Sequence, residues 1–274
     1  GKRGMTAPRL ETLVLAGTAE SREVVDALKA NLSISLTASL AGATPDPAPL
    51  PVPTRMGGFG GAEGLAAYAR DHGVGLLIDA THPFARQLSR NAREAAMMTG
   101  IPCLRLERPP WTPQAGDKWR SFDSWQDMAD AIPSGARVFL AGGTQSIEIF
   151  TRRDDITLLA RALNVEGRVG PANATFINAL PQTEAEERRT FSDNGITLLC
   201  CKNSGGPASF AKIAAARDLG IPVWMLRRHH PEDDMPVMGG GGERQVANDQ
   251  IHETVESVVL AARRLAEEVA AGKG

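Results

Sequence analysis

The sequence predicts an α/β protein with two parallel-sheet domains. Short apolar runs alternate with amphipathic runs along the chain, a pattern typical of strand-helix-strand units. Two of the apolar runs end in a glycine turn that leads into a helix start, at Leu13–Arg22 and again at Val138–Gln145. The chain has 274 residues, which suits two domains of about 130 residues better than one. These observations favour two Rossmann-like domains.

An internal duplication would explain why similar motifs recur along the chain. Gly100–Pro102 and Gly220–Pro222 lie 120 residues apart, and each follows an Ala- and Arg-rich helix and precedes an apolar strand that ends in arginine. Units of common α/β size could also produce one such match. With the duplication, we expect an N-terminal domain over residues 5–133 and a C-terminal domain over residues 134–274.

Apolar periodicity and glycine or proline stop signals locate the individual elements. The expected strands are residues 12–16, 34–39, 76–79, 103–106, 138–141, 156–160, 174–177 and 198–201. The expected helices are residues 19–30, 62–71, 84–99, 125–132, 183–193 and 247–270. Leu32 and Ile251 are expected on the buried faces of the first and last helices. Between elements we expect a proline-rich link at 45–53, a glycine-rich loop at 55–61 and a mobile glycine loop at 235–243.

Composition limits the classes of partner. The net charge of -2 gives no general attraction to nucleic acid or to a membrane surface. No apolar run approaches the roughly 20 residues of a membrane helix, so we expect a cytoplasmic protein without membrane partners. Cys103, Cys200 and Cys201 lie in or beside apolar runs without metal or redox spacing, which indicates buried free thiols. No set of His, Cys and carboxylate residues suggests a metal site.

Polar clusters follow the predicted strands at their carboxyl ends. They are Gly17–Glu20, Thr81–Pro83, Gly142–Gln145 and Lys202–Gly206. In open parallel sheets, ligands bind beyond these ends. We therefore expect all four clusters to open towards a cleft between the two domains, which would hold the active site.

The first glycine turn is a candidate nucleotide site. The fingerprint G-x-G-x-x-G does not occur, and a single glycine at Gly17 is weak evidence. However, the run Thr37–Leu40, which ends the second strand, lacks the acid that an NAD site usually offers to the ribose. A neutral strand end does not repel a 2′-phosphate. If a dinucleotide binds here, NADPH is favoured over NADH.

Each charged residue that is a candidate for catalysis or ligand binding also has an ordinary structural interpretation. His82, before Pro83, could be a proton donor or a substrate partner, or an ordinary loop histidine. Arg105 and Arg227 could be surface charges, although arginines at strand ends in both halves favour an anionic ligand. Lys202 has the same two interpretations.

Five segments together carry a resemblance to a known family. They are Gly17–Arg22, Met56–Leu65, Ile78–Ala85, Leu104–Pro109 and Lys202–Gly206. Over residues 13–228 the chain resembles the precorrin-6A reductase family of cobalamin biosynthesis, and the combination D-A-T-H-P-F-A with K-N-S-G-G is the most specific part. A departure near Thr144 leaves the role of the second glycine turn open.

The resemblance implies a two-domain enzyme that uses NADPH to reduce one C=C double bond of the tetrapyrrole precorrin-6A, giving precorrin-6B. Contacts with other enzymes of that pathway would be compatible with this role. On this basis His82 and Lys202 are candidates for catalysis. The residues expected to bind the cofactor are Gly17, Thr18, Ala19, Glu20, Arg22, Ser39, Thr81, Gly142 and Thr144. The residues expected to bind the substrate are Arg105, Asn203, Ser204, Gly205 and Arg227.

Two alternatives stay open at this point. A cobalt-containing precorrin-6A would keep the fold and the reaction class but change the substrate. A non-catalytic two-lobed protein that carries a tetrapyrrole or a nucleotide would keep the fold and have no reaction.

Overall fold

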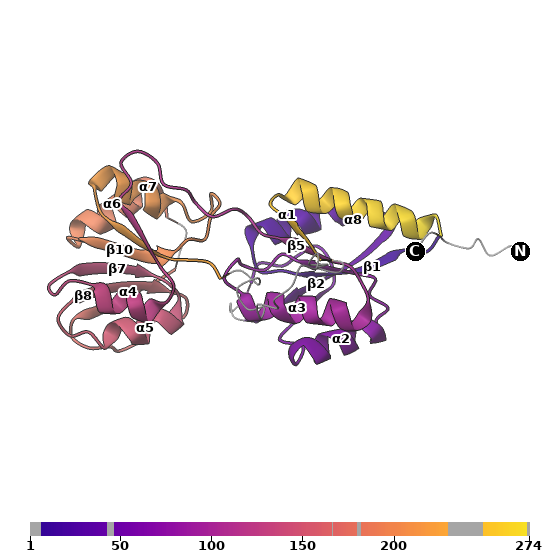
Figure 1. The fold of residues 1–274 in the computed structure, drawn as a ribbon, viewed down its shortest axis with the longest axis horizontal. Coiled ribbons are helices and arrows are strands. Elements are labelled where there is room, and N and C mark those ends of the chain that lie inside the picture. The colour runs from indigo at the N-terminus through magenta and orange to yellow at the C-terminus, as the bar shows by residue number, and fades with distance from the viewer. Residues whose placement is uncertain (1–6, 43–46, 166, 180–181, 230–248, 273–274) are drawn as a thin grey trace, which may run out of the picture. The chain divides into compact units, whose positions relative to one another are not determined.

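The chain folds into two units, each built around a parallel sheet (Figure 1). A computed structural model describes residues 7–42, 47–165, 167–179, 182–229 and 249–272. The first unit contains Gly1–Arg108 and Pro231–Gly274, and the second contains Pro109–His230. The glycine loop expected at 235–243 lies outside the described residues.

The first unit has a six-stranded sheet in the order β12-β5-β4-β1-β2-β3, and every neighbouring pair is parallel. Its elements are β1 (Leu10–Leu15), α1 (Ala19–Leu28), β2 (Ile34–Leu40), β3 (Thr54–Met56), α2 (Gly61–Asp71), β4 (Leu76–Asp79), α3 (Arg86–Thr99), β5 (Cys103–Leu106), β12 (Asp249–His252) and α8 (Val255–Ala270). Helices α1 and α8 cover one face of the sheet, and α2 and α3 cover the other (Figure 1).

The second unit has a six-stranded parallel sheet in the order β6-β11-β10-β7-β8-β9. Its elements are β6 (Trp119–Phe122), α4 (Trp125–Ala131), β7 (Arg137–Ala141), α5 (Thr144–Thr151), β8 (Thr157–Ala162), β9 (Ala174–Asn178), α6 (Glu184–Asp193), β10 (Leu198–Lys202), α7 (Ala211–Leu219) and β11 (Val223–Leu226). Helices α4 and α5 contribute to the core on one face, and α6 and α7 to the core on the other.

The two sheets repeat one strand order, which confirms the predicted repeat of plan. Strands β5, β4, β1, β2 and β3 of the first sheet correspond in order to β11, β10, β7, β8 and β9 of the second. The sixth strand of each sheet comes from the other half of the chain. Strand β6 follows β5 in sequence but pairs with β11, whereas β12 follows β11 in sequence but pairs with β5.

This exchange corrects the expected domain boundaries. A division at residues 133 and 134 would place β6 and α4 in the first domain and α8 in the second. Instead, Phe122 and Met128 are buried in the core of the second unit. Val258 and Ala262 of α8 are buried against the sheet of the first unit. Apolar burial therefore assigns both segments to the unit with which they pair.

Three local predictions also need correction. Residues 249–252 form strand β12 rather than the first turn of the last helix. That helix begins after Thr254, and the side chain of Thr254 accepts a hydrogen bond from the amide of Ser257. Ile251 is accordingly 57% exposed. Leu32 is 87% exposed because α1 ends at Leu28. The first two residues of the glycine loop expected at 55–61 belong to edge strand β3. All three cysteines are buried free thiols, as predicted.

Candidate functional site

The turn after β1 presents two backbone amides at the start of α1. Thr18 caps the helix, since its Oγ1 accepts a hydrogen bond from the Ser21 amide at 3.0 Å and donates to the carbonyl of Ala80 at 2.8 Å. The amides of Gly17 and Thr18 donate to Ser21 Oγ at 3.2 and 3.1 Å. The next two amides, of Ala19 and Glu20, open the helix and have no acceptor within it. A phosphate at this turn would therefore bind there.

Two pockets lie at this end of the first sheet. The larger, of about 440 Å³, is lined by the turn and by the loop after β4, including Gly17, Ala19, Arg22, Thr81 and His82. The smaller, of about 120 Å³, is lined by Ser39, the glycine loop 57–61 and residues of α2 and α3. Ala16, Ala41, Thr81 and Leu88 line both pockets. The two pockets are therefore adjacent along the carboxyl edge of the sheet.

Two predicted cofactor residues have side chains that hold the protein together at this edge. Glu20 forms an ion pair with Arg108, with 2.8 Å between Oε2 and Nη1. This pairing offsets the repulsion that a carboxylate beside a phosphate would create. The guanidinium of Arg22 donates to the carbonyls of Ala48 and Pro49 at 2.9 Å each, which ties the proline-rich link to α1.

A buried ion pair sets the loop after β4. Asp79 Oδ2 lies 2.6 Å from Arg105 Nη1, and Arg105 Nε lies 3.3 Å from Glu107 Oε2. Asp79 Oδ1 also accepts from the amide and the hydroxyl of Thr81, at 3.1 and 2.7 Å. Burial alone would lower the pKa of Arg105, but the nearby charges of Asp79 and Glu107 outweigh this effect and raise that pKa. This network fixes Thr81 and the residues that follow it.

The same network changes the interpretation of Arg105. The side chain was expected to bind an anionic substrate, but Arg105 is only 6% exposed and its guanidinium is occupied by two carboxylates of the protein. It also contacts Ser89 of α3. We therefore assign Arg105 a structural role and do not retain it among the substrate ligands.

His82 lies in the loop that this network positions, and it lines the larger pocket. Its Nδ1 accepts a hydrogen bond from the Phe84 amide at 3.2 Å, and its ring stacks obliquely on Phe84 with 5.9 Å between centroids. An accepting Nδ1 places the proton of a neutral imidazole on Nε2. His82 can therefore donate a proton or a hydrogen bond from Nε2.

In the second unit, the glycine turn after β7 lies beside Lys202. Gly143 has a φ of +82° and precedes α5, which Thr144 begins. A Cβ built on Gly143 would lie 3.7 Å from Lys202 Nζ, so the ammonium is next to the start of the helix. Burial lowers the pKa of Lys202. Gly142 is packed against Trp125, where a Cβ would come within 2.6 Å of the ring.

The segment after Lys202 is held mainly by contacts within the second unit. Asn203 Oδ1 accepts from the Trp111 amide at 2.7 Å, and Asn203 Nδ2 donates to the Trp111 carbonyl at 3.0 Å. Arg228 donates to the carbonyls of Asn203 and Ser204 at 3.1 and 2.8 Å. The side chain of Asn203 thus holds this segment in place, and Ser204 is buried, at 7% exposed.

Gly205 must be glycine for two independent reasons. Its φ is +67°, and a Cβ would lie 2.1 Å from the carbonyl oxygen of Pro109 and 2.7 Å from Arg228 Nη2. We expect Gly205→Ala to lower the free energy of unfolding by about 2–4 kcal/mol, the sum of left-handed strain and a steric clash with backbone. Gly135→Ala is the matched control, because Gly135 has a φ of +82° but nothing within 4 Å of a Cβ, and it should cost only about 1 kcal/mol.

Tryptophan fluorescence is the appropriate probe, because all four tryptophans lie within residues 109–230 of the second unit. Urea titrations of both variants should separate the clash from the strain. Equal losses in the two variants would mean that the contact with Pro109 relaxes without cost.

Arg227 differs from the buried arginines. Its Nη1 lies 2.7 Å from Asp123 Oδ1, and these side chains are 58% and 76% exposed. An exposed ion pair exchanges readily with solvent and contributes little to stability. Arg227 therefore remains available to an anionic ligand.

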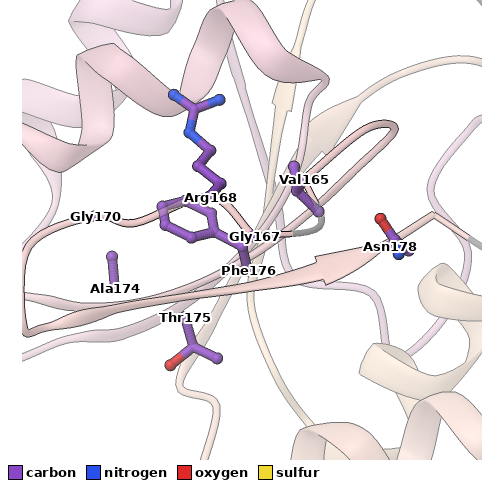
Figure 2. A pocket seen from close by; sticks show the side chains of 8 residues that line it. All are labelled: Val165, Gly167, Arg168, Gly170, Ala174, Thr175, Phe176 and Asn178. Atoms are coloured by element: carbon purple, nitrogen blue, oxygen red, sulfur yellow. The ribbon is translucent and has the colours of Figure 1, made fainter.

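A further pocket of about 330 Å³ lies in the second unit, away from the predicted site residues (Figure 2). It is lined by residues of the segment after β8 and of β9. The guanidinium of Arg168 stacks on the ring of Phe176, with 5.3 Å from Cζ to the ring centroid. Figure 2 shows the side chain of Thr175 pointing away from this pair. The pocket contains none of the residues that the sequence singled out.

The structure thus gathers the predicted residues other than Arg105 and Arg227 into one group in each unit. The first group is Gly17, Thr18, Ala19, Glu20, Arg22, Ser39, Thr81 and His82, at the carboxyl ends of β1, β2 and β4. The second is Gly142, Thr144, Lys202, Asn203, Ser204 and Gly205, at the carboxyl ends of β7 and β10. Sequence reasoning missed Arg55, which donates to Ser39 Oγ. The signal that could have indicated Arg55 is its position as the first residue of the glycine-rich segment 55–61.

Two further observations concern other classes of site. Among the described residues, no three or more His, Cys, Asp and Glu side chains are grouped as metal ligands. No helix in the described part of the chain has the length and apolar character needed to cross a membrane.

The fold and these edge residues define a two-domain α/β protein of Rossmann-like order, with its candidate ligand groups at the carboxyl ends of parallel strands. The profile of a family described as "Precorrin-6x reductase CbiJ/CobK" matches residues 11–260. The chain belongs to this family, and it is therefore an oxidoreductase.

Individual relatives agree with this assignment. A precorrin-6A reductase of Sinorhizobium sp is 41% identical over 244 residues, covering 87% of this chain and 92% of the relative. A cobalt-precorrin-6A reductase of Priestia megaterium is 29% identical, covering 79% and 89%. The solved structure of a CobK precorrin-6A reductase superposes with a TM-score of 0.79 at 35% identity, covering 93% of this chain and 96% of that one.

Proposed function

We propose that the protein reduces one C=C double bond of precorrin-6A to give precorrin-6B, with NADPH as the reductant. Family membership supports the reaction class, and the relatives at 40% identity or more that match most of this chain carry the name precorrin-6A reductase. When bound, NADPH supplies the hydride to one carbon, and the protein must supply a proton to its neighbour.

The nucleotide part of the proposal rests on one observation above all. The carboxyl end of β2 carries Ser39 rather than an acid, and Ser39 lines a pocket beside the α1 turn. A carboxylate there would bind the ribose hydroxyls of NADH and repel the 2′-phosphate of NADPH. The amides of Ala19 and Glu20 would hold the pyrophosphate, and Thr81 would line the path of the nucleotide along the sheet edge.

The residues present fit this group. Thr18 and Ser21 fix the turn through mutual hydrogen bonds, so the two remaining amides are oriented before a ligand arrives. The hydrogen bond from Thr18 to Ala80 fixes the turn relative to the loop after β4. Orienting the binding groups in advance lowers the entropic cost of binding.

In the proposed complex with the substrate, basic and polar groups of the second unit bind the carboxylates of the macrocycle. Lys202 lies beside the start of α5, where the helix dipole and the amides of the glycine turn also favour anions. Ser204 and Arg227 are the further candidates. For the proton, the two candidate donors are His82 through Nε2 and Lys202 through its ammonium.

A reduction assay tests the proposed function. The full chain is incubated with precorrin-6A and NADPH, and loss of the near-ultraviolet band of NADPH is followed together with the mass of the product. We expect one NADPH consumed for each macrocycle that gains two hydrogens. Binding of the macrocycle without consumption of NADPH would instead identify a carrier.

A second candidate function is reduction of a cobalt-containing precorrin-6A, because cobalt-precorrin-6A reductases are also among the relatives. Parallel assays with metal-free and cobalt-loaded substrate compare kcat/KM directly. The higher identity to the precorrin-6A reductases favours the metal-free macrocycle.

A further inference from the structure

Arg55 lies beside Ser39, the residue at the carboxyl end of β2 that lines the smaller pocket. It is the middle residue of edge strand β3, and its Cα is paired in register with that of Ser39 on β2. Ser39 in turn is paired with Leu15 at the end of β1. Neighbours in register project to the same face of a parallel sheet, so Arg55 and Ser39 share one face at the carboxyl edge.

The local structure holds the guanidinium in one orientation. Nη1 donates to Ser39 Oγ at 3.1 Å and to the Gly57 carbonyl at 2.9 Å, and Nη2 donates to the Gly58 carbonyl at 3.2 Å. The group also stacks on Phe59, with 3.7 Å from Cζ to the ring centroid. Gly57 has a φ of +98°, a conformation that lets the loop turn its carbonyls towards the arginine. Phe59 and the carbonyls therefore orient the side chain before any ligand binds.

Two features leave this arginine suited to an anion. A guanidinium has five N–H donors, and the three bonds above leave the Nε donor and one Nη2 donor without a partner among the described residues. Among the residues that the structure describes, no carboxylate forms an ion pair with Arg55. By contrast, Arg105, Arg108 and Arg161 are each paired with an acid. Two unused donors and an unneutralised charge match a phosphate.

We propose that Arg55 binds the 2′-phosphate of NADPH and thereby sets the preference for NADPH over NADH. The hydroxyl of Ser39, which accepts from Arg55, can donate its own proton to the same phosphate. This inference rests on the proposed NADPH site and adds the residue that distinguishes the two nucleotides. It predicts an effect confined to ligands that carry the 2′-phosphate.

The test uses fragments of the nucleotide, so that it does not depend on turnover. Binding of 2′,5′-ADP and of 5′-AMP to the full-length protein is measured by calorimetry for the wild type and for Arg55→Gln. Loss of charge-assisted hydrogen bonds should weaken 2′,5′-ADP about 10- to 100-fold and leave 5′-AMP unchanged. Arg55→Lys, which keeps the charge but not the planar fork, should weaken 2′,5′-ADP by less.

Arg70→Gln is the matched control. Arg70 is an exposed arginine of α2 that also donates to a backbone carbonyl, that of Met98 at 3.2 Å. It should change neither affinity. A second readout is the ratio of KM for NADPH to KM for NADH, which Arg55→Gln should raise while Arg70→Gln leaves it constant.

The outcomes separate this inference from the proposed function. If wild-type protein prefers 2′,5′-ADP and Arg55→Gln keeps that preference, Arg55 is excluded and the NADPH site stands. Transfer of the effect to Arg22→Gln, an arginine that lines the larger pocket, would have the same meaning. If the wild type does not distinguish the two fragments, NADPH specificity itself fails. Should Arg55→Gln lose its fold by circular dichroism, the result with Arg55→Lys decides.

Discussion

Replacing Arg105 with methionine should lower the free energy of unfolding by about 3–5 kcal/mol, because it removes the counter-charge of the buried carboxylate of Asp79. The side chains of Arg105 and Asp79 are 7% and 2% exposed, so water cannot replace the lost interaction. Methionine approximates the volume of the arginine stem, which limits any cavity contribution. The measurement is urea unfolding followed by far-ultraviolet circular dichroism.

Arg227→Met provides the matched control for this change. Arg227 also pairs with an aspartate, at 2.7 Å, but both partners are exposed, so the loss should stay within about 0.5 kcal/mol. Tryptophan fluorescence follows unfolding of the second unit, because all four tryptophans lie there, whereas Arg105 belongs to the first unit. It therefore tests whether the loss of stability is confined to the first unit. A cost below about 1 kcal/mol for Arg105→Met would contradict the structural role of Arg105 and return it to the substrate candidates.

The ion pair also has a consequence for binding. Asp79 accepts two hydrogen bonds from Thr81, and Thr81 lines the larger and the smaller pocket described above. Without Arg105, Asp79 loses the partner that fixes its carboxylate. Weaker nucleotide binding in Arg105→Met would therefore arise through the loop and not through a lost ligand.

Arg105 illustrates what the sequence could and could not predict. The apolar strand runs and the polar clusters at their carboxyl ends were visible, and the structure confirms both. The pairing of Arg105 with Asp79, 26 residues earlier, depends on the register between β4 and β5. Registers are tertiary properties, so a strand-end arginine looks the same in sequence whether it binds a ligand or a buried acid.

The sequence did not indicate edge strands β3 and β6, although it did indicate edge strand β9 at residues 174–177. β3 has three residues with exposed or half-buried side chains, and β6 is largely exposed. Neither contains an apolar run, because an edge strand of this kind takes its conformation from pairing with a neighbour. Strand β4, which was predicted correctly, is buried along its whole length.

The exchange of β6 and β12 explains why the boundary prediction failed although the repeat was recognised. Consecutive elements usually pack together, and the expected boundary after residue 133 accordingly left residues 119–122 in the same domain as β5. In the structure, the corresponding edge of each sheet is formed by a strand from the other half of the chain. Nothing in the local pattern of residues 119–122 distinguishes pairing with β5 from pairing with β11.

Loss of the proton donor should have the largest effect on the reaction. General acids contribute about 100- to 10,000-fold to a rate, so removal of the donor should lower kcat by at least about 100-fold. Lys202→Met and His82→Gln are made separately. Lys118→Met is the matched control for the lysine, because Lys118 is an exposed residue of the same unit, and its turnover should equal that of the wild type.

The pH profile distinguishes a donor from a binding group. Burial lowers the pKa of Lys202 from its usual value of 10.5, and an amine is protonated only below its pKa. If Lys202 donates the proton, kcat of the wild type falls as pH rises through that lowered pKa, and Lys202→Met lacks this limb. If Lys202 only binds a carboxylate of the substrate, Lys202→Met raises KM and leaves kcat unchanged.

The two variants together decide the assignment. A large loss in His82→Gln with the alkaline limb preserved would make His82 the donor through Nε2, the nitrogen left with the proton when Nδ1 accepts from Phe84. Because Phe84 N–H would also lose its acceptor, the fold of His82→Gln is checked by thermal melting. Unchanged kcat in both variants would remove both residues from the chemistry and point to a water molecule as the source of the proton.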